Sequence, residues 1–275
     1  MANIITDLKQ LISQEASPNQ LFKRNVVKQY LQIMVLDFLY SHPTYSQLVF
    51  YGGTCLSLVH GLPRLSEDLD FVDLKQSIDL SILAKDLESS LSKTIGLEVK
   101  TTVQKFRTYL KFPLLHILKL SSETESDWLF IKVEIFNQFN FCSDYTLETK
   151  PLFKFNKSLL VKTFDLPTLM ATKIRAVLNR TWTKTDKSGK ELISVKGRDY
   201  FDLMWYLEKN VEPNYNCLEM ASNKEELQKL LMATVNKLDV RSIQLDLESF
   251  IDNSNYISKL SSEIKDILER GIQNL

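Results

Sequence analysis

The sequence has no excess of charge of either sign. Lys and Arg together number 34, as do Asp and Glu, in a chain of 275 residues. A global basic field for RNA is therefore absent, and any nucleic-acid contact has to come from a local patch. The N-terminus lacks a basic stretch followed by an apolar one, and no segment approaches about 18 consecutive apolar residues. We expect a soluble, cytoplasmic protein without a membrane partner.

Cysteine and histidine are also scarce. The cysteines are Cys55, Cys142 and Cys217, which are odd in number, far apart and without the spacing of a metal site. We interpret them as ordinary small apolar residues in a reducing cytoplasm. The three histidines are scattered along the chain, which argues against a zinc site and against a Ser-His triad.

Residues 49–72 carry the clearest chemical pattern, VFYGGTCLSLVHGLPRLSEDLDFV. The pattern predicts a strand, a Gly-Gly turn, a short helix, a loop with proline and a second strand. Side chains alternate along a strand, so Asp68 and Asp70 point the same way. Two neighbouring carboxylates repel by roughly a few kcal/mol at an effective dielectric near 20 unless a cation relieves them. Mg²⁺ prefers a carboxylate or two together with substrate phosphates, and this pair offers such a site.

The Gly-Gly turn at Gly52 and Gly53 adds a second feature, because bare backbone amides at a helix start hold phosphate. Each feature has a simpler interpretation. Asp-x-Asp is usually the solvated face of a strand, and Gly-Gly is usually a turn that needs positive φ. Neither interpretation requires the two features to occur together in this order, and their conjunction favours nucleotidyl transfer.

This run resembles the first motif of the DNA polymerase β-like nucleotidyltransferase superfamily, and more narrowly the AbiEii-type abortive-infection nucleotidyltransferase toxins. The matching residues are Gly52, Gly53, Thr54, Arg64, Ser66, Asp68, Leu69, Asp70 and Phe71. The wider superfamily has Gly-Ser where this chain has Gly53-Thr54, so the hydroxyl lies one place further on. The resemblance implies that the glycines and Thr54 bind the nucleotide. Arg64 and Ser66 either order the loop or touch a phosphate.

Hydrophobic periodicity predicts the organisation of the rest of the chain. Helical spacing covers residues 20–41 and 79–95. Alternation predicts three strands, at 97–103, 109–120 and 128–136. We therefore expect an α+β protein, with a polymerase β-like domain at 1–164 containing a mixed sheet and flanking helices. An all-helical domain at 165–275 follows and is expected to close the nucleotide cleft.

The helical part carries clear start signals. Asp165 followed by Pro167 predicts one helix start, and Asn223 with Glu226 forms a capping box for a later one. Helices are predicted over 223–239 and 254–270. The polar segment at 181–197 is the best candidate for a mobile loop.

Glu134 is the candidate third carboxylate. It lies with Lys132 on one face of the predicted strand 128–136. In the resembled superfamily such an acid, on a strand beside the Asp-x-Asp strand, completes the metal site or draws the proton from the attacking hydroxyl. The simpler alternative is a Lys–Glu pair on a solvated strand face.

Two later motifs also resemble the family. Lys173 and Arg180 are seven residues apart on one helical stripe, and the resemblance implies that Lys173 faces the nucleotide phosphates. Arg175 and Arg180 are interpreted as contacting nucleic-acid backbone or solvent. Asp199 is implied to orient Lys173 or an arginine, whereas the helix dipole alone is sufficient reason for one acid in this first turn. The aromatic residues that follow are expected to pack the core rather than stack on a base.

Taken together, the resemblance implies a Mg²⁺- or Mn²⁺-dependent enzyme that moves a nucleoside monophosphate from a nucleoside triphosphate to an acceptor hydroxyl. It further implies the 3′ end of tRNA as acceptor, a cognate antitoxin as partner and a role in growth inhibition or phage defence. Two alternatives remain open at this point: nucleotidylation of a protein, and a non-catalytic protein that binds a nucleotide or a partner.

Overall fold

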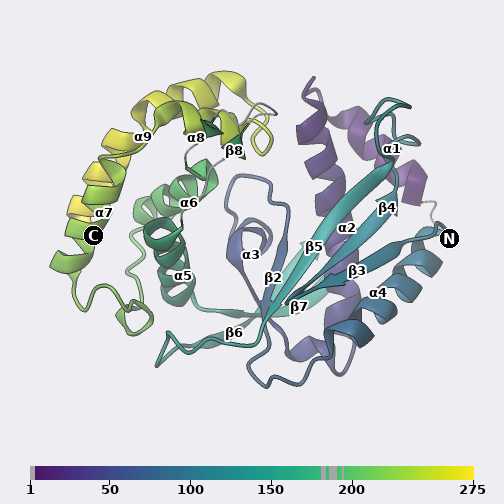
Figure 1. The fold of residues 1–275 in the computed structure, drawn as a ribbon, viewed down its shortest axis with the longest axis horizontal. Helices are drawn as coiled ribbons and strands as arrows, with labels where there is room; N and C mark the ends of the chain where they lie inside the picture. Colours follow the sequence, from purple (N-terminus) through teal and green to yellow (C-terminus); the bar gives the residue numbers. More distant parts are fainter. Residues whose placement is uncertain (1–3, 181–183, 186–190, 194) are drawn as a thin grey trace. The chain divides into compact units, whose positions relative to one another are not determined.

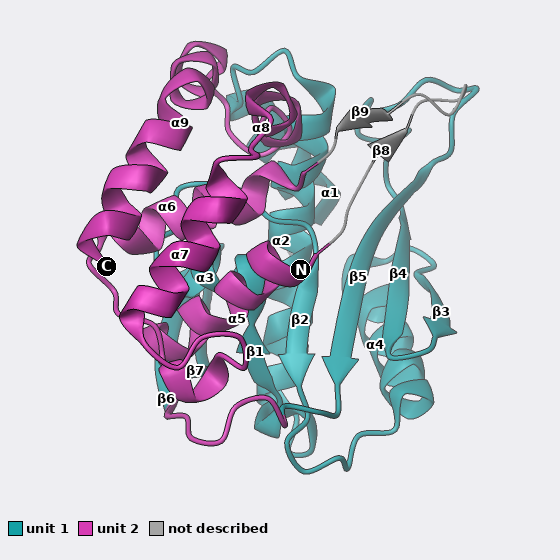
Figure 2. Ribbon diagram, turned by 60° about the vertical axis from the view of Figure 1, so that its left-hand side comes forward, with its two compact units in different colours: residues 1–139, 148–163 teal, residues 140–147, 164–275 magenta. Residues whose placement is uncertain are grey.

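A computed structural model describes residues 4–180, 184–185, 191–193 and 195–275. The chain divides into two compact units, which Figure 2 colours separately. Unit 1 comprises residues 1–139 and 148–163, and unit 2 comprises residues 140–147 and 164–275. Within the described residues, no helix combines the length and the apolar character needed to cross a bilayer.

A seven-stranded mixed sheet forms the centre of unit 1, with strand order β3-β4-β5-β2-β1-β7-β6 (Figure 1). β2 is antiparallel to β1 but parallel to β5, and β1 is parallel to β7. The strands are β1 (Val49–Tyr51), β2 (Leu69–Val72), β3 (Lys100–Gln104), β4 (Arg107–Pro113), β5 (Trp128–Phe136), β6 (Leu147–Lys154) and β7 (Lys157–Phe164).

The helices of unit 1 are α1 (Ile4–Gln14), α2 (Gln20–Ser41), α3 (Gly52–Val59) and α4 (Leu80–Ile95), with a 3-10 turn η1 (Tyr45–Gln47). Side chains cap the two long helices as the sequence pattern requires. Asn19 accepts from the first amides of α2, and Asp79 does the same for α4. Gly96 then ends α4 at a φ of 76°. The predicted helices at 20–41 and 79–95 are confirmed.

The predicted strands between 97 and 136 are also present, although the middle one is shorter than expected. β4 ends at Pro113, and the residues after it turn back, with the Leu118 amide donating to the Leu114 carbonyl. The hairpin of β6 and β7 was not predicted. It extends the sheet beyond β1.

Unit 2 is mainly helical. Its elements are α5 (Leu166–Asn179), β8 (Lys184–Thr185), β9 (Glu191–Ile193), α6 (Gly197–Glu208), η2 (Tyr215–Cys217), α7 (Lys224–Val235), α8 (Val240–Leu247) and α9 (Ser254–Asn274). Asp165 caps α5 and Asn223 caps α7, as predicted. The helix predicted over 223–239 is shorter, because α7 ends at Val235 and a new cap at Asp239 begins α8.

The segment predicted as a mobile loop, 181–197, lies partly outside the described residues, which omit 181–183, 186–190 and 194. What is described of it contains the two short strands β8 and β9, which pair antiparallel.

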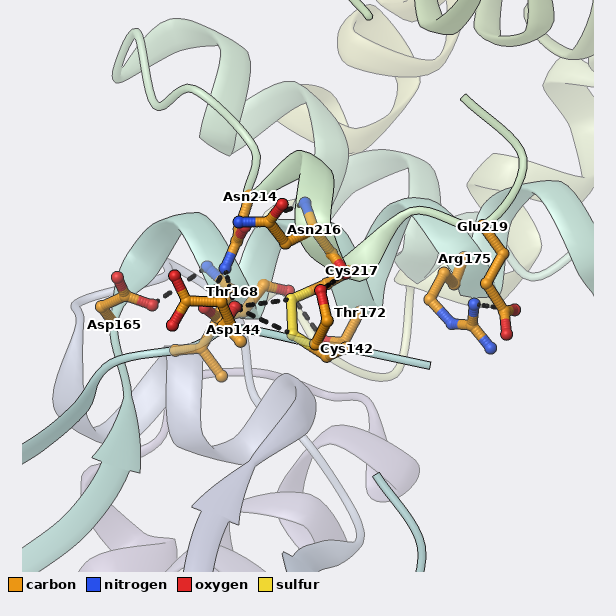
Figure 3. The surroundings of a disulfide bond; sticks show 12 residues. Cys142, Asp144, Asp165, Thr168, Thr172, Arg175, Asn214, Asn216, Cys217 and Glu219 are labelled. Carbon is orange, nitrogen blue, oxygen red and sulfur yellow. Dashed lines mark hydrogen bonds and ion pairs between the residues drawn. A yellow bond between two sulfur atoms is a disulfide. The ribbon is translucent and has the colours of Figure 1, made fainter. Parts of the chain in front are cut away.

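The interpretation of all three cysteines as ordinary small residues is wrong for two of them. Cys142 and Cys217 form a disulfide (Figure 3). Cys55 is free and buried. Backbone pairing brings the two chain segments together, because the Ser143 amide donates to the Asn216 carbonyl. The Asn214 side-chain amide also donates to the Asp144 carbonyl at 2.7 Å. The disulfide joins residues 75 positions apart, and cysteine spacing alone does not reveal it.

Candidate active site

Sheet register aligns the acidic residues of unit 1. Asp70 on β2 pairs with Tyr51 on β1 and, in parallel register, with Glu134 on β5. Side chains that are directly opposite on adjacent strands lie on the same face of a sheet. Asp68 precedes Asp70 by two residues and therefore belongs to the same side. The predicted third acid thus comes from the strand next to the Asp-x-Asp strand.

The surroundings of Asp70 change its pKa. Burial first, and then the negative charges of Asp68 and Glu134, raise the pKa of Asp70 to about 8. The Glu134 side chain is 12% exposed and that of Asp68 is 34% exposed. The site is therefore a crowded, partly buried group of acids rather than a solvated strand face.

Two cations lie against these acids. Lys132 Nζ is 2.8 Å from Asp68 Oδ2 and 3.2 Å from Glu134 Oε1. Arg107 on β4 places its Nε 3.2 Å from the same Oε1 of Glu134. The ion pair of Lys132 with Glu134 that was considered from the sequence exists, but Lys132 also pairs with Asp68, and both side chains of the Lys132–Glu134 pair are largely buried.

The glycine turn touches the acids directly. Gly52 has a φ of +78°, and a Cβ at this position would lie 2.3 Å from Asp70 Oδ2. A Cβ on Gly53 would lie 2.8 Å from Arg64 Nη2 and 3.1 Å from Ser66 Oγ. The turn starts α3, whose first amides have no partner within the helix and are available to an anion. A Cβ at Gly52 would therefore displace the Asp70 carboxylate, and a Cβ at Gly53 would displace the Arg64 side chain.

The remaining motif residues of unit 1 organise the loop. Thr54 is buried and its hydroxyl donates to the Asp68 carbonyl, which holds the acidic strand against α3. Arg64 is buried as well, with Nη1 donating to the Leu65 carbonyl at 2.8 Å. The Ser66 carbonyl accepts from the Gln32 side chain at 3.0 Å. These contacts order the loop, which is one of the two roles considered for Arg64 and Ser66.

Unit 2 contains a second charged network. Lys173 Nζ lies 2.8 Å from Asp199 Oδ1 and 2.7 Å from Asp202 Oδ2, and Arg180 also pairs with Asp199. Burial alone would raise the pKa of Asp199, but the charges of Lys173 and Arg180 hold it well below its ordinary value. Asp199 therefore pairs with both Lys173 and Arg180, and its orienting role stays a prediction of the motif.

Asp202 is an additional member that we did not select from the sequence. Its side chain is fully buried against Lys173. The available signal was its spacing, because it is the second acid of the Arg-Asp-x-x-Asp motif and lies one helical turn after Asp199.

The interpretation of Arg175 as a contact to nucleic acid or solvent is not what the structure shows. Arg175 pairs with Glu219 (Figure 3). Its guanidinium also stacks over the Phe141 ring, 3.7 Å from the centroid. The aromatic residues of α6 are buried, as expected; they are Tyr200, Phe201, Trp205 and Tyr206.

The donor chemistry of unit 1 fits a divalent cation, although the present arrangement is not a finished metal site. Asp68, Asp70 and Glu134 offer the oxygen ligands that Mg²⁺ and Mn²⁺ prefer. Their mutual repulsion, seen in the raised pKa of Asp70, is what a divalent ion would relieve. Within the part of the chain that the structure describes, no three His, Cys, Asp or Glu side chains are already placed to hold a metal. Lys132 lies between two of the acids.

Comparison with known proteins decides the family. A family model described as "Nucleotidyl transferase AbiEii toxin, Type IV TA system" matches residues 37–270. The chain belongs to the AbiEii family. As a member of it, the protein is a nucleotidyltransferase toxin of a toxin–antitoxin system. No curated protein sequence matches this AbiEii chain.

The solved structure of one nucleotidyltransferase toxin supports the fold of this AbiEii protein. MenT4, a nucleotidyltransferase toxin from Mycobacterium tuberculosis H37Rv, is similar at a TM-score of 0.56 and 12% identity. The match covers 98% of this chain and 90% of MenT4. JHP933 from Helicobacter pylori matches at a TM-score of 0.48 and 15% identity, over 91% of this chain and 94% of that one. At such low identity the likeness to MenT4 shows the fold alone.

Proposed function

We propose that this AbiEii protein transfers a nucleoside monophosphate from a nucleoside triphosphate to the 3′ hydroxyl of a tRNA in a metal-dependent reaction. The observation that carries the proposal is the alignment of Asp70 with Glu134 directly beside the Gly52 turn. Nucleotidyl transfer requires acids in contact with a turn that binds phosphate. A segment β1–α3–β2 with a purely structural role would require neither.

The acids of unit 1 would hold the metal. Asp68, Asp70 and Glu134 are the proposed ligands for Mg²⁺ or Mn²⁺, which when bound supplies charge neutralisation and polarisation at the α-phosphate. The amides of Gly52 and Gly53, with Thr54 shaping the turn, would bind the triphosphate tail. We also propose that Glu134 accepts the proton of the attacking hydroxyl.

The reaction forms a bond between the acceptor oxygen and the α-phosphorus and breaks the bond to the β-phosphate, with pyrophosphate as the leaving group. Lys173 is assigned to the phosphates of the substrate, where its charge would stabilise the developing negative charge. Asp199 would hold Lys173 in one orientation. These two assignments rest on the family motif and on the local network of unit 2.

A labelling experiment tests the proposal. The protein is incubated with each nucleoside triphosphate labelled at the α-phosphate, with Mg²⁺ and total small RNA. Asp70→Asn serves as the inactive variant and Asp79→Asn, which changes an acid at the distant cap of α4, serves as the control. We expect labelled tRNA with the wild type and with Asp79→Asn, and none with Asp70→Asn.

Other products would redirect the assignment. A labelled protein in place of labelled RNA would favour nucleotidylation of a protein. Metal-dependent nucleotide binding without any labelled acceptor would favour a non-catalytic role.

The biological role is tested separately. Family membership implies a cognate antitoxin, and we propose that expression of the wild type without it arrests growth. Expression of Asp70→Asn at the same level should leave growth normal. Equal toxicity of the two forms would separate toxicity from the acidic site.

A further inference from the structure

Lys132 is the most closely held cation of the acidic site. It lies on the same face of β5 as Glu134, two residues away, and pairs across to Tyr109 on β4. Its ammonium group contacts Asp68 Oδ2 at 2.8 Å and Glu134 Oε1 at 3.2 Å, so it joins an acid before β2 to an acid on β5. Its side chain is 23% exposed.

The oxygens that Lys132 contacts are the oxygens that a divalent cation needs. Arg107 reaches Glu134 as well, but the ion pairs of the described residues join it to that acid and not to Asp68. Of Lys132 and Arg107, only Lys132 is joined by these ion pairs to both Asp68 and Glu134. An ammonium and a metal ion cannot occupy one position between the same carboxylates, so binding of one requires the other to leave.

We propose that Lys132 is a tethered counter-ion that occupies the cation position of the acidic site and yields it when a metal–nucleotide complex binds. The proposal rests on the proposed function, because it assigns Asp68 and Glu134 to the metal. A lysine suits this role, since its charge sits at the end of a flexible stem and carries three rotatable donors. The displaced ammonium group would find a new partner in the phosphates of the substrate.

The arrangement has a consequence for the order of binding. A metal ion that arrives alone has to break two ion pairs of Lys132 without offering it a replacement. A metal ion that arrives with a triphosphate supplies the replacement, so the two ligands should favour each other's binding, and by linkage the effect is reciprocal. Lys132 would thereby keep the free protein from binding metal in the absence of substrate.

The test measures Mn²⁺ binding to the nucleotide-free protein by electron paramagnetic resonance, which needs no turnover. Lys132→Gln removes the charge, Lys132→Arg retains it, and Lys132→Met is a second neutral variant in case the first folds poorly. Lys111→Gln is the matched control. Lys111 lies on β4, two residues after Tyr109, which pairs with Lys132, and it therefore points to the same face of the sheet as Lys132. Unfolding temperatures confirm that each variant is folded.

We expect Lys132→Gln to bind Mn²⁺ at least tenfold more tightly than the wild type, with Lys132→Arg close to the wild type. Lys111→Gln should change the affinity by no more than about threefold, since only long-range charge is lost. A non-hydrolysable triphosphate should then tighten Mn²⁺ binding by a larger factor in the wild type than in Lys132→Gln.

Unchanged or weaker Mn²⁺ binding in Lys132→Gln would overturn the proposal, as would an equal gain in Lys111→Gln. The proposed function is judged by a different result. If the wild type labels RNA but Lys132→Gln binds Mn²⁺ no more tightly than the wild type, the counter-ion role fails and the proposed function stands. If Lys132→Gln gains affinity but no acceptor is ever labelled, the function fails and the counter-ion role stands.

Discussion

Asp70 stands directly opposite Glu134 in the parallel pairing of β2 with β5. The pairing places two acids from distant parts of the chain on one face of the sheet, where burial and their mutual repulsion make them costly to keep. A sheet under no functional demand has no reason to put three carboxylates together and then counter them with Lys132 and Arg107. The cost is best explained by the chemistry of nucleotidyl transfer.

The burial and mutual repulsion of these acids predict that removing one of them stabilises the folded protein at high pH. The pKa of Asp70 is raised from 3.8 to about 8, so between these values the folded protein holds a proton that the unfolded chain releases. Stability therefore falls as the pH rises through this window. Asp70→Asn lacks the effect, and its unfolding temperature should exceed the wild type's by a few degrees near pH 8.5 and match it near pH 5. Calorimetry across this range is the measurement, and a variant less stable at every pH would contradict it.

Two of the glycines at positive φ, Gly52 and Gly61, allow a controlled test of the turn. Gly52 and Gly61 have φ values of +78° and +77°, but a Cβ would meet Asp70 Oδ2 at 2.3 Å at Gly52 and nothing within 4 Å at Gly61. Both Gly→Ala changes carry the same backbone strain, about 1–2 kcal/mol. Only Gly52→Ala should also displace Asp70, and we expect it to lower the transfer rate at least 100-fold.

The Gly61→Ala variant is the control in that rate assay. It should keep activity within about threefold of the wild type despite its strain. Similar losses in both variants would mean that backbone strain, and not contact with Asp70, determines the effect.

The parts of the site that follow from local rules were predictable from the sequence. Alternation along a strand placed Asp68 and Asp70 together, and the motif pointed to Glu134 on a neighbouring strand. The contact of Lys132 with Asp68 was not predictable. These residues are 64 positions apart, and they meet only because β2 and β5 align in the folded sheet.

The hairpin of β6 and β7 was missed for two physical reasons. Its turn is Phe155–Asn156, with φ values of 49° and 57°, and phenylalanine is not a residue that usually signals such a turn. Its outward face carries Phe153 and Leu160, which are 73% and 66% exposed. Apolar residues on both faces remove the alternation from which a strand is predicted.

The buried ion pairs of unit 2 predict a large stability effect at Asp202. Its carboxylate is fully buried and lies 2.7 Å from Lys173 Nζ. Asp202→Asn removes one negative charge beside that buried ammonium, and we expect the free energy of unfolding to fall by about 2–4 kcal/mol. Glu219→Gln is the matched control, because Glu219 pairs with Arg175 at an exposed position and should cost at most about 1 kcal/mol. Denaturant titration measures both, and equal effects would show that burial of the Lys173 network adds no stability.

The disulfide predicts that reduction weakens unit 2. Cys142 and Cys217 are 75 positions apart, and both lie in this unit. In the chain-entropy model, opening a loop of this length lowers the free energy of unfolding by about 4 kcal/mol. A thiol reductant should therefore lower the unfolding temperature of the wild type and of Cys55→Ala, whose cysteine is free and buried. The double variant Cys142→Ser with Cys217→Ser should unfold at the lower temperature with or without reductant. A wild type that responds to reductant no more than the double variant does would show that the bridge does not constrain the unfolded chain.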